Sequence, residues 1–119
     1  SGSGDETELW DGTQGGMSAY LEYYENGVLT RVPLERASTL IGRLRSQVDF
    51  AVTNPRVGKI HAEFIVRDGK VFVKDLNSKN GTYINGNLQR LGSNVEYPLK
   101  DRDRVSMADS EFTLRCSSR

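Results

Sequence analysis

The 119-residue chain is predicted to form an all-β domain, a sandwich or a barrel, on the strength of three observations. Apolar and polar residues alternate in several short segments, as expected for strands with one buried face. β-branched and aromatic residues dominate these segments, and such residues favour pleated sheets. Turn sequences that contain Gly separate the segments, and no stretch sustains the 3.6-residue period of a helix. Together these features indicate one domain built from short strands.

The expected strands follow one another along most of the chain. In residues 19–24 the odd-numbered positions can face a core, and residues 28–34 repeat the pattern. Pro33 lacks a backbone N–H, which indicates a sheet edge or a strand end. Asn-Gly and Asp-Gly pairs supply the positive φ angles of tight hairpins. The other alternating segments are residues 62–67, 70–75, 104–107 and 111–116, and the turn signals are residues 25–27, 67–69, 80–81, 85–86 and 109–110.

The composition excludes several classes of protein. A single Cys and a single His leave no internal disulfide and no Cys/His zinc site. The lone His also leaves too few groups for acid–base or triad catalysis, so we expect no enzyme activity. No apolar run approaches the roughly 20 residues of a membrane-spanning helix, and the first residues do not form a signal peptide. We expect a cytoplasmic domain that needs no metal or other cofactor and does not insert into a membrane.

The formal net charge of zero conceals an uneven distribution. Residues 1–27 hold six acidic residues and no basic residue, whereas residues 28–119 hold all 16 basic residues and ten acidic ones, a net charge of +6. A basic body favours anionic partners. Aromatic residues do not interleave with the basic loop, and the charge is modest for a protein that follows a nucleic-acid backbone. We therefore expect no nucleic acid among the partners.

The chain divides into a tail and a domain. Residues 1–18 are acidic and Gly-rich, and we expect them to be flexible. Residues 1–4 resemble a remnant of cloning, and the chain is expected to be one domain of a longer protein. The domain is expected over residues 19–116, followed by a short C-terminal tail at residues 117–119.

Three segments between the expected strands carry basic and amide side chains. The first is Ile41–Arg43, where a strand ends in a small residue followed by a guanidinium. The second, Asn54–Ala62, closes the long basic loop that begins at Leu44. The third, Asp75–Gly86, contains two Asn-Gly turns and a lysine. Long loops on a rigid sheet often carry function, so a binding site is expected where these segments meet.

The order and spacing of these segments resemble the forkhead-associated (FHA) family. The family pattern is Gly-Arg, then Ser-x-x-His-Ala, then Asp-Leu-x-Ser-x-Asn-Gly-Thr-x-x-Asn-Gly, and finally Leu-x-Asp-x-Asp. This chain has Gly42 and Arg43, then Gly58–Ala62, Asp75–Gly86 and Leu99–Asp103. The resemblance implies an FHA/SMAD-like two-sheet β-sandwich of about eleven strands, of the bacterial type, with its ligand loops at one end. It also implies a module that binds phosphothreonine-containing protein segments in Ser/Thr kinase signalling.

The resemblance also implies a role for each matching residue. Arg43 is expected to anchor the phosphate, since its planar fork can donate two charge-assisted hydrogen bonds. Two lysines would assist it, an amide would hold the backbone of the peptide, and an arginine would contact residues after the phosphothreonine. These residues are Lys59 and Lys79, Asn80, and Arg56, while the residues expected to support the loops are Gly42, His61, Gly81, Asn85 and Gly86.

One residue departs from the family pattern. The serine whose hydroxyl donates to phosphate is replaced by Gly58, which can offer only its backbone N–H. Losing one such hydrogen bond costs about 1–2 kcal/mol, roughly tenfold in affinity. The alternative function is therefore a phosphate-independent protein–protein interaction domain on a degenerate FHA scaffold.

The acidic tail provides a candidate phosphoacceptor. Thr7 lies between acidic residues, a setting that resembles the N-terminal threonine sites of some bacterial FHA proteins. In those proteins a Ser/Thr kinase modifies the tail, and the domain can then bind its own phosphothreonine. The glycines at residues 12–16 would give the tail the necessary reach. The expected partners are therefore a phosphothreonine-containing protein or the chain's own phosphorylated tail, together with the kinase.

Overall fold

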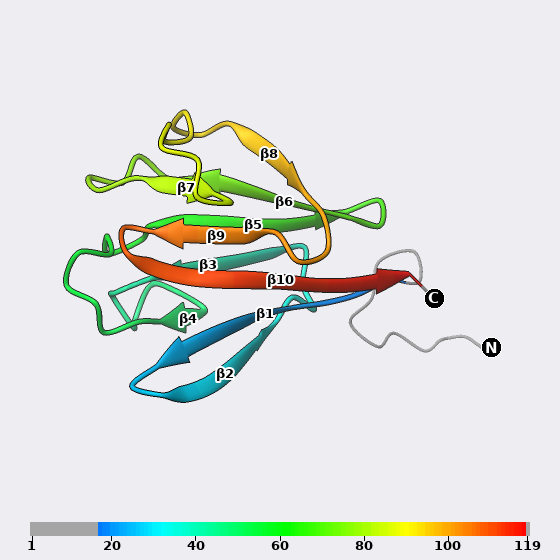
Figure 1. The fold of residues 1–119 in the computed structure, drawn as a ribbon, viewed down its shortest axis with the longest axis horizontal. Helices are drawn as coiled ribbons and strands as arrows, with labels where there is room; N and C mark the ends of the chain where they lie inside the picture. Colours follow the sequence, from blue (N-terminus) through cyan, green and yellow to red (C-terminus); the bar gives the residue numbers. More distant parts are fainter. Residues whose placement is uncertain (1–16, 119) are drawn as a thin grey trace.

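The computed structural model describes residues 17–118, which form two five-stranded sheets packed face to face (Figure 1). The first sheet has the strand order β2-β1-β10-β9-β7, and the second has the order β4-β3-β5-β6-β8. All pairs are antiparallel except β3 with β4. The strands are β1 (Met17–Glu25), β2 (Val28–Pro33), β3 (Ser38–Gly42), β4 (Phe50–Ala51), β5 (Ala62–Arg67), β6 (Lys70–Asp75), β7 (Thr82–Ile84), β8 (Glu96–Leu99), β9 (Arg104–Met107) and β10 (Ser110–Ser118).

The core lies between the sheets and is built by the predicted alternation. Leu21 and Tyr23 of β1 are buried, as are Phe112 of β10 and Phe64 of β5. Tyr23 stacks on Phe112 with ring centroids 4.3 Å apart, and Phe50 of β4 meets Tyr23 edge-on at 6.0 Å. Burying each such side chain contributes about 1.5–3 kcal/mol. The short strand β4 thus ties the basic loop to the core.

The predicted two-sheet sandwich is confirmed, and the differences lie in the short strands. Residues 17–118 hold ten strands, against an expectation of about eleven. The alternating segments do not include β3, of which only the end before Arg43 was expected, or β4, β7 and β8, which have only two to four residues each. Pro33 ends β2, which is an edge strand as its sequence predicted.

The first and last strands extend beyond residues 19–116, the range expected for the domain. β1 begins at Met17, which is buried, whereas the domain was expected to start at residue 19. β10 runs to Ser118, whose partner on β1 is Met17, so it includes two residues of the expected C-terminal tail. Thr7 and the rest of the N-terminal tail up to residue 16 lie outside the described residues.

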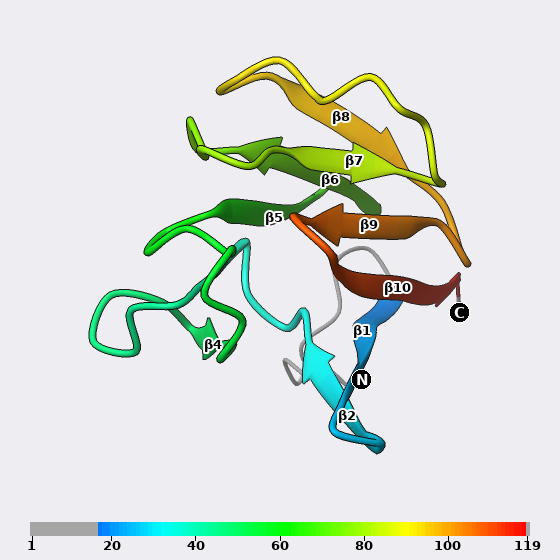
Figure 2. The same ribbon diagram turned by 60° about the vertical axis from the view of Figure 1, so that its left-hand side comes forward.

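The connections of the sandwich separate into two ends. Figure 1 and Figure 2 show the segments that follow β3 and β6 at one end, while β1 starts and β10 finishes at the other. Glu25, the last residue of β1, accepts hydrogen bonds from the hydroxyl of Thr53 at 2.5 Å and its N–H at 3.3 Å. The hairpin after β1 therefore lies beside the basic loop. Within residues 17–118 there is no helix that could cross a membrane.

Candidate functional site

The first two predicted loop segments are joined backbone to backbone. The N–H of Arg43 donates to the carbonyl of Gly58 at 2.9 Å, and the N–H of Leu44 donates to the carbonyl of Lys59 at 3.1 Å. Gly42 permits this approach, because a Cβ atom there would lie 2.8 Å from the carbonyl carbon of Lys59 and closer still to its oxygen. The glycine of the Gly-Arg pair is therefore required by packing rather than by its backbone angles.

Arg43 is exposed and held by a neutral group. Its Nε donates to the carbonyl oxygen of Val57 at 2.9 Å, and Val57 itself is buried. No acidic side chain within residues 17–118 forms an ion pair with Arg43. One edge of the guanidinium is thus fixed to the loop, while its terminal nitrogens can donate to an external anion.

His61 joins the second loop segment to the third. The side chain is fully buried, and its Nδ1 accepts a hydrogen bond from the N–H of Gly58 at 2.9 Å. Nδ1 must then carry the lone pair, so the ring's proton is on Nε2, which donates to the carbonyl of Gly81 at 2.9 Å. Burial lowers the pKa of His61 and outweighs the opposing effects of Gly81 and Asp75. A neutral imidazole therefore joins the second and third loop segments through two hydrogen bonds to the backbone.

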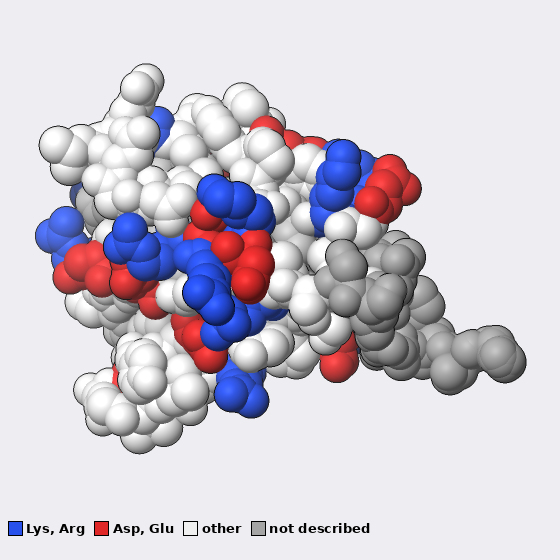
Figure 3. Space-filling model, turned by 45° about the vertical axis from the view of Figure 1, so that its right-hand side comes forward, with Lys and Arg blue, Asp and Glu red and all other residues white. Residues whose placement is uncertain are grey.

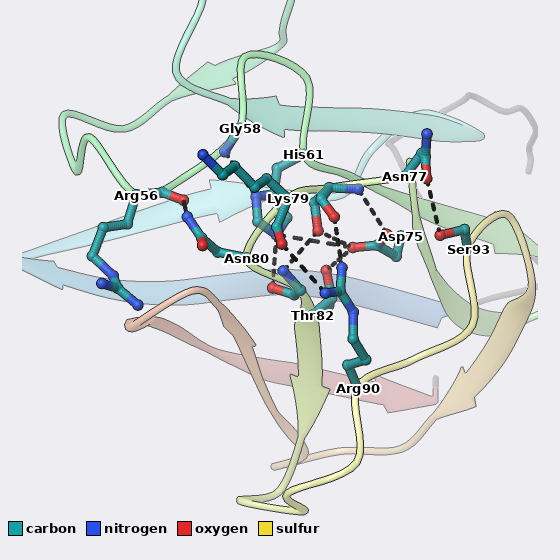
Figure 4. Close-up of polar contacts among 12 residues, drawn as sticks. Arg56, Gly58, His61, Asp75, Asn77, Lys79, Asn80, Thr82, Arg90 and Ser93 are labelled. Carbon is teal, nitrogen blue, oxygen red and sulfur yellow. Dashed lines mark hydrogen bonds and ion pairs between the residues drawn. The ribbon is translucent and has the colours of Figure 1, made fainter.

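The buried side chain of Asp75 holds the third loop segment through hydrogen bonds. Its carboxylate is buried and accepts hydrogen bonds from the hydroxyls of Ser78 and Thr82, both at 2.6 Å, and from the N–H of Ser78 at 3.0 Å (Figure 4). Burial alone would raise the pKa of Asp75, but these hydrogen bonds prevail and lower it. The hydroxyl of Ser78 also accepts from the N–H of Gly81 at 3.0 Å. The buried carboxylate thus fixes the turn that carries Lys79 and Asn80.

The predicted peptide contacts lie across the two loops. The side-chain amide of Asn80 donates to the carbonyl of Arg56 at 2.7 Å, which links the third segment to the second (Figure 4). Arg56 is exposed, and its Nε lies 3.7 Å from a carboxylate oxygen of Asp109. Lys59 and Lys79 are also exposed and form no ion pair with an acidic side chain of residues 17–118. The residues expected to touch a ligand therefore belong to loops that meet at one end of the sandwich.

Basic side chains elsewhere on the domain are more often balanced by acids. Arg104 lies 3.4 Å from Glu111, and Arg115 lies 3.3 Å from Asp101. Figure 3 shows a face on which basic and acidic side chains are interspersed. Such a face offers an anion little net attraction, whereas Arg43, Lys59 and Lys79 of the loop end form no ion pair with an acidic side chain in the described part of the chain.

Asn85 and Gly86 occupy the turn after β7, where both have positive φ angles of 53° and 73°. The side chain of Asn85 donates to Asp103 at 3.0 Å and accepts from the N–H of Arg104 at 2.8 Å. These contacts support the sheet rather than the loop end.

Two features of the site could not be found from the sequence. The N–H of Gly58, expected to be offered to phosphate, already donates to His61 in this structure. The guanidinium of Arg90 donates to the carbonyls of Ser78 and Lys79, although Arg90 lies outside every recognised segment. Both interactions involve backbone groups, and the direction of a backbone N–H or C=O cannot be deduced from the residue types. The only available sign was that Arg90 is basic.

Comparison with known proteins agrees with this geometry. The model of the FHA domain family matches residues 39–108. A protein phosphatase 1 regulatory inhibitor subunit PPP1R8 homolog of Arabidopsis thaliana is 28% identical over 100 residues, which cover 82% of this chain and 27% of that protein. This chain therefore spans about a quarter of the length of that relative.

Two solved structures are similar in both sequence and fold. Mycobacterium tuberculosis EmbR in complex with a low-affinity phosphopeptide is 30% identical, with a TM-score of 0.72, over 86% of this chain and 25% of that one. The MEK1 FHA domain in complex with a phosphothreonine peptide of HOP1 is 27% identical, with a TM-score of 0.69, over 82% of this chain and 94% of that one. Because the family model covers more than half of the sequence and the sandwich matches, this chain belongs to the FHA domain family.

Proposed function

We propose that this domain binds phosphothreonine-containing protein segments in Ser/Thr kinase signalling. The observation that carries the proposal is the state of Arg43, which is exposed, anchored by a neutral carbonyl and unpaired with any carboxylate of residues 17–118. An arginine in this state is not neutralised by a carboxylate of the described residues, so it is available to bind an anionic ligand. A phosphothreonine carries close to two negative charges and several acceptor oxygens, which match a guanidinium fork.

The remaining roles follow from position. Lys59 adjoins Gly58, whose carbonyl holds the backbone of Arg43, and Lys79 lies on the turn fixed by Asp75. Both would add charge around the phosphate. Asn80 keeps its side-chain carbonyl for the peptide while its amide group is bound to Arg56. Two similar FHA-containing structures hold phosphopeptides, which supports the same class of ligand here. A bacterial source and a cytoplasmic setting complete the proposal.

The alternative is a protein interaction that does not depend on phosphate. Gly58 favours it, because the hydroxyl of the family pattern is missing and the N–H of Gly58 is already bound to His61. The charge of Arg43 favours phosphate binding, because no acidic side chain within residues 17–118 forms an ion pair with it. Phosphate recognition is therefore the leading proposal, with an affinity reduced by about tenfold for one missing hydrogen bond.

A titration separates the two functions. Phosphothreonine peptides and their unphosphorylated counterparts are titrated into the domain, and the phosphorylated form is expected to bind at least tenfold more tightly. Arg43→Ala should weaken binding of the phosphorylated peptide by about 150-fold or more, since two charge-assisted hydrogen bonds of about 1.5–3 kcal/mol each are lost. Arg104→Ala is the matched control, because it removes the same charge from a residue paired with Glu111. Equal affinity for both peptides, unchanged by Arg43→Ala, would establish the alternative.

A second candidate ligand is the chain's own tail phosphorylated at Thr7. Nine residues lie between Thr7 and Met17, so ten Cα-to-Cα steps carry the tail at most about 35 Å from the start of β1. β1 itself spans nine residues, about 27 Å, and its far end lies beside the basic loop. The tail would have to extend to about three quarters of its maximum length to cover the length of β1. The site of a second copy imposes no such limit.

The tail proposal is tested with the chain phosphorylated by a Ser/Thr kinase. Mass spectrometry should locate the phosphate on Thr7, and amide resonances around Arg43 should shift. Dilution then separates the two geometries, because shifts caused by a second copy disappear at low concentration and shifts caused by the same chain do not. No phosphate on Thr7, or no shift near Arg43, would rule out the tail as a ligand.

A further inference from the structure

Arg90 holds the turn of the third loop segment from outside the recognised motifs. It lies between β7 and β8, and its two terminal nitrogens donate to the carbonyl of Ser78 at 2.6 Å and that of Lys79 at 3.3 Å. Figure 4 shows Arg90 approaching the turn from the side away from Gly58. One guanidinium therefore binds two successive peptide carbonyls, so both carbonyls point toward the same side of the turn.

Because the peptide bond is planar, this contact also sets the direction of the neighbouring N–H groups. In a trans peptide the N–H points opposite to the C=O of the same unit. The carbonyl of Ser78 shares its peptide unit with the N–H of Lys79, and the carbonyl of Lys79 shares its unit with the N–H of Asn80. Both N–H groups must then point away from Arg90. Neither donates to an acceptor within residues 17–118.

Two successive N–H groups that point the same way form a concave donor site for anions. The positive guanidinium on the other side polarises both peptide units, which strengthens the N–H groups as donors. We propose that Arg90 is a positioning residue of the phosphate site, which aims the N–H groups of Lys79 and Asn80 at the bound phosphate. These donors would compensate in part for the hydroxyl missing at Gly58. The inference rests on the proposed function and adds donors to the same site.

Arg90 can be removed without collapsing the core. Its side chain is exposed and borders an open cavity of about 490 Å³, which Gln89, Leu91 and Tyr97 also line. If the guanidinium is lost, water can hydrate the two carbonyls. Gly81 lets Arg90 pack closely, since a Cβ atom there would lie 3.2 Å from its Nε. A change at Arg90 should therefore alter the orientation of the turn more than the stability of the fold.

The test compares Arg90→Ala and Arg90→Lys with Gln89→Ala, a control on the same loop and cavity. In the ligand-free domain, Arg90→Ala should shift the amide resonances of Lys79 and Asn80 and lower their backbone order parameters. Phosphothreonine peptide affinity should fall about five- to tenfold. Arg90→Lys should restore little of the affinity, because one ammonium cannot hold two carbonyls as a planar fork does. Gln89→Ala should change neither quantity.

Each outcome supports or overturns the positioning role. Unchanged amides in ligand-free Arg90→Ala would overturn it, and this measurement needs no ligand. Full rescue by Arg90→Lys would also overturn it, since charge alone would then account for the effect. If the wild-type domain binds no phosphopeptide, the proposed function fails. Titration with inorganic phosphate then decides the inference through the amides of Lys79 and Asn80, which must shift in the wild-type domain and not in Arg90→Ala.

Discussion

The loop end of the sandwich contains two polar regions that are built in opposite ways. Beneath the surface, His61, Asp75 and Thr82 are fully buried, and each side chain is hydrogen-bonded. At the surface, Arg43 and Lys79 are exposed and form no ion pair with a carboxylate of residues 17–118. The buried region satisfies its polar groups internally, and the exposed region leaves its charges available.

This difference separates stability from binding. Buried polar groups stabilise a fold only when every partner is present, so the lower region fixes the shape of the loops. Exposed cations that form no ion pair add little to stability, and their charge is available to a ligand. Changes in the lower region should therefore alter the free energy of unfolding, and changes in the upper region should alter affinity alone.

The largest expected effect comes from Asp75→Ala. It leaves the buried donors of Ser78 and Thr82 without an acceptor, and we expect the free energy of unfolding to fall by about 3 kcal/mol. Urea unfolding measures the change. Glu111→Ala, which breaks an exposed pair with Arg104, should cost at most about 1 kcal/mol. Equal losses in the two variants would contradict the separation between buried and exposed regions.

A smaller effect is expected from pH through His61, the only histidine of the chain. Because burial lowers the pKa of His61 in the folded domain, the unfolded chain binds the proton first as the pH falls. The free energy of unfolding should therefore decrease below about pH 6.5, by up to about 1.4 kcal/mol per pH unit. The decrease due to this group ends once the pH falls below its lowered pKa in the folded state.

Urea unfolding at pH 7.5, 6.5 and 5.5 measures this dependence, and His61→Gln should remove it over the same range. The titration of the imidazole by NMR is an independent check in the wild-type domain. Protonation of Nδ1 would break its hydrogen bond with the N–H of Gly58, so the amide resonance of Gly58 should shift with it. A midpoint at or above pH 6.5 in the folded domain would show that burial does not dominate.

The smallest expected effect is a gain in affinity from Gly58→Ser. A Cβ atom at this position would lie 3.5 Å from Nδ1 of His61, an ordinary contact, so serine fits without strain. The new hydroxyl should improve phosphothreonine peptide affinity about fivefold, about 1 kcal/mol, with stability unchanged. Gly58→Ala adds the same Cβ without a donor and should give no gain. Calorimetric titration distinguishes them, and identical affinities would show that the hydroxyl does not reach the phosphate.

The sequence predicted the larger part of the fold because its strands and turns have local signatures. Asn26, Asp68 and Asn85 precede glycines, and all three have the positive φ angles expected of hairpin turns. Among the strands without a recognised alternation, β4, β7 and β8 are too short for it to be seen, and Pro98 further weakens the pattern of β8. These strands form only because neighbouring strands provide pairing partners, which is a tertiary effect.

The candidate site was predictable to the extent that side chains define it. The grouping of the three segments followed from the family pattern, and the structure brings them together through Gly42, His61 and Asn80. The hydrogen bonds of the Arg43 and Arg90 side chains to backbone carbonyls could not be predicted from the sequence. These contacts depend on the direction of backbone groups. Such contacts can be recognised only once the loops have been placed in space.

The pairing of Met17 with Ser118 has a consequence for any longer polypeptide that contains this domain. Chain that precedes β1 and chain that follows β10 attach at adjacent points, on the end of the sandwich away from the basic loop (Figure 1). The domain can thus be inserted between two other domains and project to one side of them. Its recognition loops would then project outward, and a partner could dock there without displacing the neighbouring units.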